Sequence, residues 1–394
     1  MEHAVFEYFP THYSWNMGLL MAAQLGGELT EIDEACRPLQ EIAKRPNAKD
    51  DPEAQAAWLT QWEKLARKVE GFAKRDEAAG HELTAGKKYL RACAYFFSAE
   101  RMAGHASPKK MELYNAMVEC FNRGVRLRCE PIEAVEIPYE GTTLDALYYR
   151  APGAGRKPVM IHFDGFDVTK EWMHLCGISR EFAARGISTL MVDHPGVGST
   201  LRIKHIPVNF DSERWASAAI DWLEKREDAD AKRVGVIAMS LGGYYAPRAA
   251  AFEKRLAACI AWGARWDNKG SHGRILRDPN AARSVTGWVD HALWYYGAKT
   301  TDEAYEKICR MTLEGVADRI TCPILVAHGA GDRQVPLEQA ERTIREAVNS
   351  SRAELRLFDA DEGGAEHVGG DLFSPTMDFM ADWAADVLKA RPAA

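Results

Sequence analysis

One short segment of the chain has the residue types and spacing of a nucleophilic site. Residues 238–243 read AMSLGG and complete the apolar run RVGVIAM at 233–239. A serine with small residues two positions before and after it is typical of a tight turn from a strand into a helix. The two elements approach closely there, and the serine oxygen is exposed. We therefore predict that Ser240 is a nucleophile rather than an ordinary turn serine.

A serine nucleophile needs a base to take its proton and an acid to orient that base. His367 is the predicted base, because it lies in the glycine-rich segment that follows the last apolar run of the chain. Asp332 is the predicted acid, because it comes directly after the run PILVAHG at 323–329. Asp267 follows the preceding apolar run and is a rival for the role of the acid.

Other histidines and acids near these positions have simpler interpretations. His162, His194 and His328 also lie near the ends of apolar runs, where a hydrogen-bonded core or pocket residue is the ordinary interpretation. None of them occupies the segment after the last run, which is where the predicted base lies. Glu366 and Asp361 are interpreted as surface charges of that segment.

Attack by a serine on a carbonyl group creates negative charge that two N–H donors can stabilise. The backbone N–H of Leu241, the residue after the nucleophile, is the first predicted donor. The second is predicted in the segment HFDGFD at 162–167, where Gly165 lets the backbone turn and Phe166 is the best candidate. An ordinary structural turn is the alternative for this segment.

The segment DHPGVGST at 193–200 is also rich in glycine and could suggest a phosphate-binding loop. The pattern G-x-x-x-x-G-K-[ST], which such a loop requires, does not occur there. We interpret the segment as a tight turn after a strand.

The elements that would position these residues are apolar runs separated by helical patterns. Continuous apolar strands that alternate with helices indicate a mainly parallel sheet buried on both faces, which carries ligands at the carboxyl ends of its strands. An alternating hairpin around Glu140-Gly141 precedes the runs. The six runs are PVMIHF (158–163), STLMVDH (188–194), RVGVIAM (233–239), LAACIAW (256–262), PILVAHG (323–329) and AELRLFD (353–359).

The first part of the chain has a different pattern. Residues 54–75 place apolar side chains at three- and four-residue steps, which is typical of an amphipathic helix, and residues 86–102 and 109–121 repeat the pattern. A chain of 394 residues suits two domains. We predict a helical domain over residues 1–130 and a catalytic domain over residues 131–394.

Composition narrows the classes of partner. A net charge of −7 and the absence of a Lys/Arg cluster argue against a nucleic-acid or membrane-surface partner and favour a small molecule. The eight cysteines form no close pair, and most lie in apolar runs, so free thiols in a reducing cytoplasmic location are expected. No segment has a signal-peptide pattern or transmembrane length. No cofactor and no metal site are expected.

These motifs resemble the FrsA-like branch of the α/β-hydrolases, which includes 2,6-dihydroxypseudooxynicotine hydrolase and fungal polyketide-shortening hydrolases. The resemblance spans nearly the whole chain. It implies an α/β-hydrolase fold, an N-terminal all-helical cap domain that contributes to the pocket, and a triad on Ser240, Asp332 and His367. Some members use a further acid, for which Asp267 is the nearest candidate. The resemblance rests on DGFDVTKEW (164–172), DHPGVGST (193–200), MSLGGYYAPRAAA (239–251), LEGVADRITCPILVAHGAGDRQVP (313–336) and DEGGAEHVGGD (361–371).

The segment from Trp262 to Tyr296 is rich in aromatic residues, and together with Trp15, Trp58 and Trp62 it favours an apolar, aromatic or polyketide-like substrate. Lys170, Arg265 and Arg333 could bind an anionic group, although surface charge is the simpler interpretation of each. The candidate pocket residues are Tyr244, Trp262, Trp266 and Asp267.

The bond that would be cut is left open between two mechanisms on the same triad. The resemblance favours hydrolysis of a carbon–carbon bond in a 1,3-diketone, and a carboxylesterase or thioesterase is the alternative. A binding or interaction protein without catalysis is the alternative from another class, and the intact triad argues against it. The amphipathic helices of the first domain could cover the site, pair two subunits into a homodimer, or both.

Overall fold

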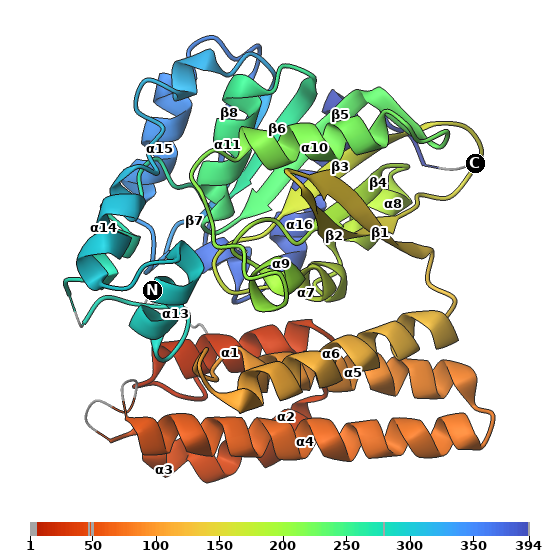
Figure 1. Cartoon of the computed structure of the whole chain (residues 1–394), viewed down its shortest axis with the longest axis vertical. Helices are drawn as coiled ribbons and strands as arrows, with labels where there is room; N and C mark the ends of the chain where they lie inside the picture. Colours follow the sequence, from red (N-terminus) through yellow and green to blue (C-terminus); the bar gives the residue numbers. More distant parts are fainter. Residues whose placement is uncertain (1–5, 46–47, 49–50, 279, 393–394) are drawn as a thin grey trace. The chain divides into compact units, whose positions relative to one another are not determined.

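The computed structural model describes residues 6–45, 48, 51–278 and 280–392 and divides into two compact units (Figure 1). The helical unit comprises the chain up to Glu130 together with Ala282–His291. The sheet unit comprises Pro131–Ala281 and Ala292–Ala394. The part of the chain that the structure describes contains no helix long and apolar enough to cross a membrane.

The helical unit is built around long amphipathic helices. The three predicted helices are confirmed as α4, α5 and α6, each beginning or ending within a few residues of its apolar pattern. Asp51 and Ser107 cap the first turns of α4 and α6 by accepting backbone N–H groups, and a proline follows each of them. The helices are α1 (Tyr13–Gln24), α2 (Leu29–Cys36), η1 (Arg37–Leu39), α3 (Gln40–Ala43), α4 (Pro52–Ala78), α5 (Glu82–Glu100) and α6 (Pro108–Leu127).

Three tryptophans form the centre of this unit. Trp15, Trp58 and Trp62 are fully buried, and their rings follow one another at centroid distances of 5.0 and 5.2 Å. The Trp58 indole N–H donates to the Ser98 carbonyl at 2.9 Å. These side chains are therefore core residues of the helical unit.

A short segment distant in sequence also belongs to the helical unit. Residues 282–291, which the sequence alone assigns to the second domain, group with the helices. The Ser14 hydroxyl donates to the Arg283 carbonyl at 2.8 Å, and His105 lies 2.8 Å from the Asp290 carboxylate. Such contacts between residues far apart in the chain leave no local pattern in the sequence.

The sheet unit contains one sheet of eight strands in the order β1-β2-β4-β3-β5-β6-β7-β8. The hairpin of β1 and β2 and the β2–β4 pair are antiparallel, and the remaining pairs are parallel. The predicted hairpin and all six predicted runs are confirmed as strands, and β6 has the predicted bounds. The strands are β1 (Ile132–Tyr139), β2 (Thr142–Tyr149), β3 (Lys157–Phe163), β4 (Ser188–Val192), β5 (Ala229–Met239), β6 (Leu256–Trp262), β7 (Ile324–Gly329) and β8 (Ala353–Phe358).

Helices cover both faces of the sheet, with α10 and α11 packed on one face and α8 and α16 on the other (Figure 1). This arrangement explains the continuous burial of β3, β4 and β6, which alternating strands would not show. The helices after β3 are α7 (Lys170–Leu175), α8 (Ile178–Ala184), α9 (Gly198–Arg202), α10 (Glu213–Leu223), α11 (Gly242–Phe252), α12 (His272–Ile275), α13 (Trp288–Tyr296), which begins within the segment 282–291 of the helical unit, α14 (Thr301–Cys309), η3 (Ala317–Arg319), α15 (Leu337–Glu346), η4 (His367–Gly369) and α16 (Phe373–Val387).

Buried histidines make the sheet unit sensitive to acid. Burial lowers the pKa of His162 and His174 to about 3 and that of His194 to about 4. Below pH ~6.5 the unfolded chain binds a proton at each histidine while the folded chain does not. The free energy of unfolding should therefore fall as the pH drops from about 6.5 to 4, by up to about 1.4 kcal/mol per pH unit for each histidine.

Urea unfolding at several pH values between 7 and 4.5 measures this dependence. His162→Leu should reduce the slope of the free energy of unfolding against pH by up to the contribution of one proton. His81→Gln, at an exposed position of the helical unit, is the matched control. A free energy of unfolding that does not change over this pH range would contradict the expectation.

Candidate active site

Ser240 occupies a strained turn between β5 and α11. Its φ angle is +59°, in the left-handed region that non-glycine residues rarely adopt. The Ser240 N–H donates to the Trp262 carbonyl at 2.8 Å, which anchors the turn to the neighbouring strand β6. A Cβ atom on Gly242 would lie 2.6 Å from the Ala238 Cβ, so the flanking residues must be small where strand and helix meet. The predicted tight turn is present.

A histidine faces the serine hydroxyl. The Ser240 Oγ lies 2.8 Å from the His367 Nε2, a hydrogen-bond distance. His367 follows β8, in the short helix η4, and only 5% of it is exposed. The serine and the histidine are 127 residues apart in the chain, and the carboxyl ends of β5 and β8 bring them together.

The Asp332 carboxylate contacts the other nitrogen of the same imidazole ring. The His367 Nδ1–H donates to the Asp332 Oδ2 at 2.7 Å. The Asp332 Oδ1 accepts the backbone N–H groups of Gln334 at 2.8 Å and Val335 at 2.9 Å. Burial by itself raises the pKa of Asp332, but the electrostatic interaction with His367 and the hydrogen bonds from His367 and the Val335 N–H outweigh it, and the pKa lies below its ordinary value. An ionised Asp332 accepts only, so Nδ1 carries the proton and Nε2 is left as the acceptor for the serine hydroxyl.

A second carboxylate, which the sequence alone does not single out, shapes the loop that carries His367. Asp371 accepts the backbone N–H groups of Gly364 at 3.0 Å, Ala365 at 3.1 Å and Glu366 at 2.8 Å. Glu366 is only 5% exposed and forms an ion pair with Arg333 at 2.7 Å, so the interpretation of Glu366 as a surface charge is wrong. The repeated glycines and acids of residues 361–371 are the only local signal of this loop.

The segment predicted to carry the second oxyanion donor runs against the turn at Ser240. A Cβ atom on Gly165 would lie 2.9 Å from the Met239 carbonyl oxygen, 3.0 Å from the Ser240 Cβ and 3.3 Å from the Leu241 nitrogen. The backbone that precedes Phe166 therefore runs in contact with the turn that contains Ser240. Within the described part of the chain, the Leu241 N–H donates to no other group.

Three of the candidate pocket residues, Tyr244, Trp262 and Trp266, pack against or hydrogen-bond to neighbouring residues of the protein. The Tyr244 hydroxyl donates to the Phe210 carbonyl at 2.8 Å, and the Trp262 ring packs edge-on against Phe373 at 5.9 Å. The Trp266 indole N–H donates to the Glu346 carboxylate at 2.7 Å, and Arg342 covers the Trp266 ring at 3.2 Å from the guanidinium carbon to the ring centroid. These contacts describe core and helix packing rather than an open pocket wall.

Asp267, the rival acid, accepts the backbone N–H of Gly270 at 2.6 Å, and its own N–H donates to the Gln339 side chain at 2.8 Å. The Asp267 carboxylate stabilises its own turn, while Asp332 binds the histidine.

The interpretation of Arg265 and Lys170 as surface charges is wrong. Arg265 is 1% exposed and Lys170 is 9% exposed. The Arg265 Nη1 donates to the Ser271 Oγ at 2.7 Å, and among the described residues Arg265 has no carboxylate partner in an ion pair. Burial lowers the pKa of the Arg265 guanidinium, which interacts electrostatically with Asp332, Tyr295 and other tyrosines nearby. A buried positive charge thus lies close to the acid of the site.

Comparison with known proteins places these features in a family. Residues 159–368 match the family described as "Alpha/beta hydrolase family". The chain is 32% identical over 360 residues to the 2,6-dihydropseudooxynicotine hydrolase of Paenarthrobacter nicotinovorans, covering 87% of this chain and 88% of that protein. It is 27% identical over 320 residues to the 20-hydroxy-prefusarin hydrolase FUS2 of Gibberella moniliformis, covering 72% and 74%. The crystal structure of the 2,6-dihydroxy-pseudo-oxynicotine hydrolase matches with a TM-score of 0.76 at 27% identity, covering 96% of this chain and 98% of that chain.

The close approach of Gly165 to the turn at Ser240 can be tested by adding a single methyl group. Gly165→Ala should lower kcat by about tenfold or more, because the new Cβ pushes the loop away from the nucleophile and displaces an oxyanion donor. Turnover of an activated ester measures the effect, with thermal unfolding as a check on folding. The matched control is Gly71→Ala, since a Cβ on that exposed helical glycine would meet no atom within 4 Å. Wild-type turnover by Gly165→Ala would contradict the placement of the loop.

Proposed function

We propose that this chain, which belongs to the alpha/beta hydrolase family, is a serine hydrolase that cleaves a carbon–carbon bond in an aromatic or polyketide-like 1,3-diketone. The relatives named above confirm the family resemblance of the motifs, and they are named hydrolases. The observation that carries the proposal is the continuous hydrogen-bonded chain from Ser240 through His367 to Asp332.

The first step is addition of the serine oxygen to a carbonyl carbon of the substrate. His367 takes the Ser240 proton on Nε2, while Asp332 holds the ring by its Nδ1–H and stabilises the imidazolium that forms. The backbone N–H groups of Leu241 and Phe166 then stabilise the oxygen anion of the tetrahedral adduct. The geometry of the three side chains supports this order of events without rearrangement.

Cleavage of the carbon–carbon bond follows from the second carbonyl group of a 1,3-diketone. When the adduct collapses, the bonding electron pair leaves on the carbon between the two carbonyl groups, as an enolate. The imidazolium of His367 holds the proton that this carbon needs, so its transfer gives a ketone and leaves an acyl group on Ser240. Water activated by His367 then releases a carboxylic acid.

Hydrolysis of an apolar aromatic ester or thioester is the second candidate, and one observation favours it. The carboxylate of Asp267 is bound within its own turn rather than beside the serine or the histidine. An ester or thioester releases an oxygen or sulfur anion, which takes the His367 proton readily. A carbon leaving group takes the same proton only when the carbon itself lies within reach of Nε2, so a site without a further acid suits the ester better.

A cytoplasmic location is part of the same proposal. All eight cysteines are free thiols, and Cys36, Cys93, Cys120, Cys176 and Cys259 are buried. Free thiols without disulfides are typical of a reducing compartment.

Ser240→Ala tests the nucleophile. The variant should lose turnover of a short activated ester by a factor of ~10⁴ or more, because addition and acyl transfer both need the serine oxygen. Steady-state kinetics with circular dichroism of the folded variant measure the effect. Turnover that survives the substitution would reject the nucleophile, and a wild-type protein inactive on every substrate would favour a binding protein.

A substrate panel run with wild type and Ser240→Ala decides between the two bonds. The panel should contain aryl 1,3-diketones, aryl esters and thioesters, and the compounds for which the relatives are named, 2,6-dihydropseudooxynicotine and 20-hydroxy-prefusarin. Carbon–carbon hydrolysis releases a carboxylic acid and a ketone or arene, which mass spectrometry detects. Turnover of esters alone would reject the diketone proposal and leave the second candidate.

A further inference from the structure

The loop between β3 and α7 lies in contact with the turn at Ser240 through Gly165, and it is anchored by side chains rather than by strand pairing. Residues 164–169 lie outside any helix or strand, and all of them are buried. At the start of the loop, the Gly165 carbonyl accepts the Tyr295 hydroxyl at 3.3 Å. The His194 ring lies between two carbonyl oxygens, with Nδ1 2.8 Å from that of Pro195 and Nε2 3.1 Å from that of Asp164, and its single N–H can bind either. Buried loop backbone keeps its conformation only where such partners satisfy it.

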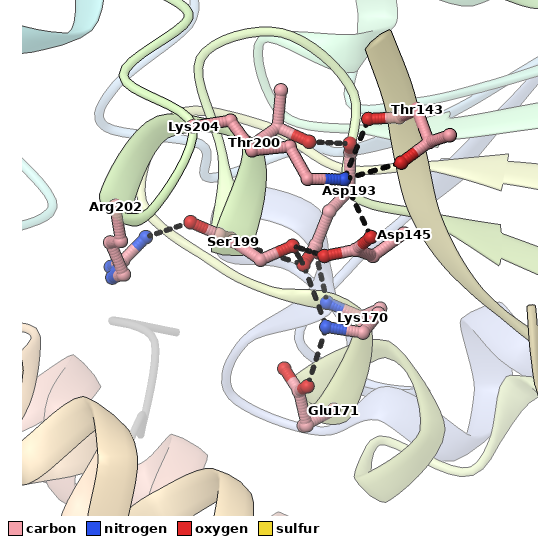
Figure 2. Close-up of polar contacts among 10 residues, drawn as sticks. Thr143, Asp145, Lys170, Glu171, Asp193, Ser199, Thr200, Arg202 and Lys204 are labelled. Carbon is pink, nitrogen blue, oxygen red and sulfur yellow. Dashed lines mark hydrogen bonds and ion pairs between the residues drawn. The ribbon is translucent and has the colours of Figure 1, made fainter. Parts of the chain in front are cut away.

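At the far end of the loop, one carboxylate holds the first residue of α7 (Figure 2). Asp193 directly follows β4 and is fully buried. It accepts the Lys170 backbone N–H at 2.8 Å and the Lys170 Nζ at 2.9 Å. It also accepts the Ser199 backbone N–H at 2.9 Å, so it joins the loop after β3 to the turn after β4.

The glycine-rich turn after β4 is shaped to admit this carboxylate. Gly198 has a φ angle of +49°, and a Cβ atom there would lie 1.9 Å from the Asp193 Cγ. A side chain at this position would therefore displace Asp193. The Ser199 N–H, which a phosphate loop would offer to a ligand, binds the protein's own carboxylate instead. Residues 193–200, called the clamp below, therefore hold the loop after β3 in place through the Asp193 carboxylate.

Charge is balanced within the clamp. The Lys170 Nζ also contacts the Glu171 Oε1 at 2.8 Å. Burial by itself raises the pKa of Asp193, but the charge of Lys170 and the hydrogen bonds from Lys170 and Ser199 outweigh it and hold the pKa below its ordinary value. Asp193 therefore remains a carboxylate that accepts every one of these hydrogen bonds.

A neighbouring ion pair in the same network is attached to a different element. The Ser199 hydroxyl donates to Asp145 on β2, and the Lys204 Nζ donates to the Asp145 Oδ1 at 2.7 Å (Figure 2). Lys204 also donates to the Thr143 carbonyl at 2.7 Å. Lys204 thus stabilises the hydrogen-bonded network around Ser199, and none of these hydrogen bonds is to the loop 164–169. Lys204 is therefore a matched control for substitutions of Asp193 or Lys170.

We propose that Asp193, acting through Lys170, is a positioning residue that holds the loop 164–169 with its oxyanion donor against the Ser240 turn. The proposal rests on the proposed function, since an oxyanion donor matters only if Ser240 attacks a carbonyl group. A donor displaced by about 1 Å loses much of its effect on the transition state while the ground state is little changed. Weakening the clamp should therefore lower kcat more than it raises KM.

The test compares Asp193→Asn with Lys204→Met in the full-length protein. Asp193→Asn should lower kcat for an activated aryl ester by about 10- to 100-fold, with KM within about threefold of wild type. An aryl trifluoromethyl ketone, whose adduct with a serine carries an oxyanion, should bind more weakly by a similar factor. Lys204→Met should leave kcat, KM and inhibitor affinity within about threefold of wild type. If Asp193→Asn does not fold, Lys170→Met replaces it in the same comparison.

Hydrogen–deuterium exchange of peptides that cover residues 164–169 reports on the loop without relying on catalysis. The proposal expects faster exchange in Asp193→Asn than in wild type or Lys204→Met. Unchanged exchange, equal losses of kcat in the two variants, or a loss confined to KM would overturn the proposal. If wild type shows no Ser240-dependent turnover, the proposed function fails, and the exchange result alone decides whether Asp193 holds the loop.

Discussion

The turn at Ser240 is the constraint on which the rest of the sheet unit depends. A serine held at a φ angle of +59° is strained, and only tight packing of the surrounding elements keeps it there. Small residues let α11 lie against β5, the Trp262 carbonyl fixes the serine N–H, and Gly165 lets the loop after β3 lie in contact with the turn. This packing places Ser240 at the carboxyl ends of the strands, where His367 and Asp332 also lie.

Carboxylates satisfy the backbone of the loops around this turn. The segments that follow parallel strands have no ladder partners for their backbone N–H groups, and an unpaired buried N–H group is costly. Asp332, Asp371 and Asp193 each accept two or more backbone N–H groups, one carboxylate for each of three loops. Asp332 also accepts the His367 Nδ1–H, so one carboxylate both shapes a loop and orients the histidine.

The sequence predicted the framework well because strands of this kind leave a local pattern. Apolar runs and turn residues predict the hairpin, the six strands and the bounds of β6 at 256–262. The sequence alone does not predict the burial of Lys170 or Arg265. Lys170 is buried with the Asp193 carboxylate as its partner, and Asp193 lies 23 residues away in the chain. Trp266 illustrates the same limit, since its partners on α15 decide that it packs rather than lines a pocket.

If His367 and Asp332 activate Ser240 as we propose, its hydroxyl is the most reactive serine hydroxyl of the chain. Labelling with an aryl fluorophosphonate, followed by peptide mass spectrometry, measures this directly in the intact protein. The account predicts a single adduct, on Ser240, formed much more slowly when His367 is replaced by alanine. An adduct on another residue, or an unlabelled wild-type protein, would contradict it.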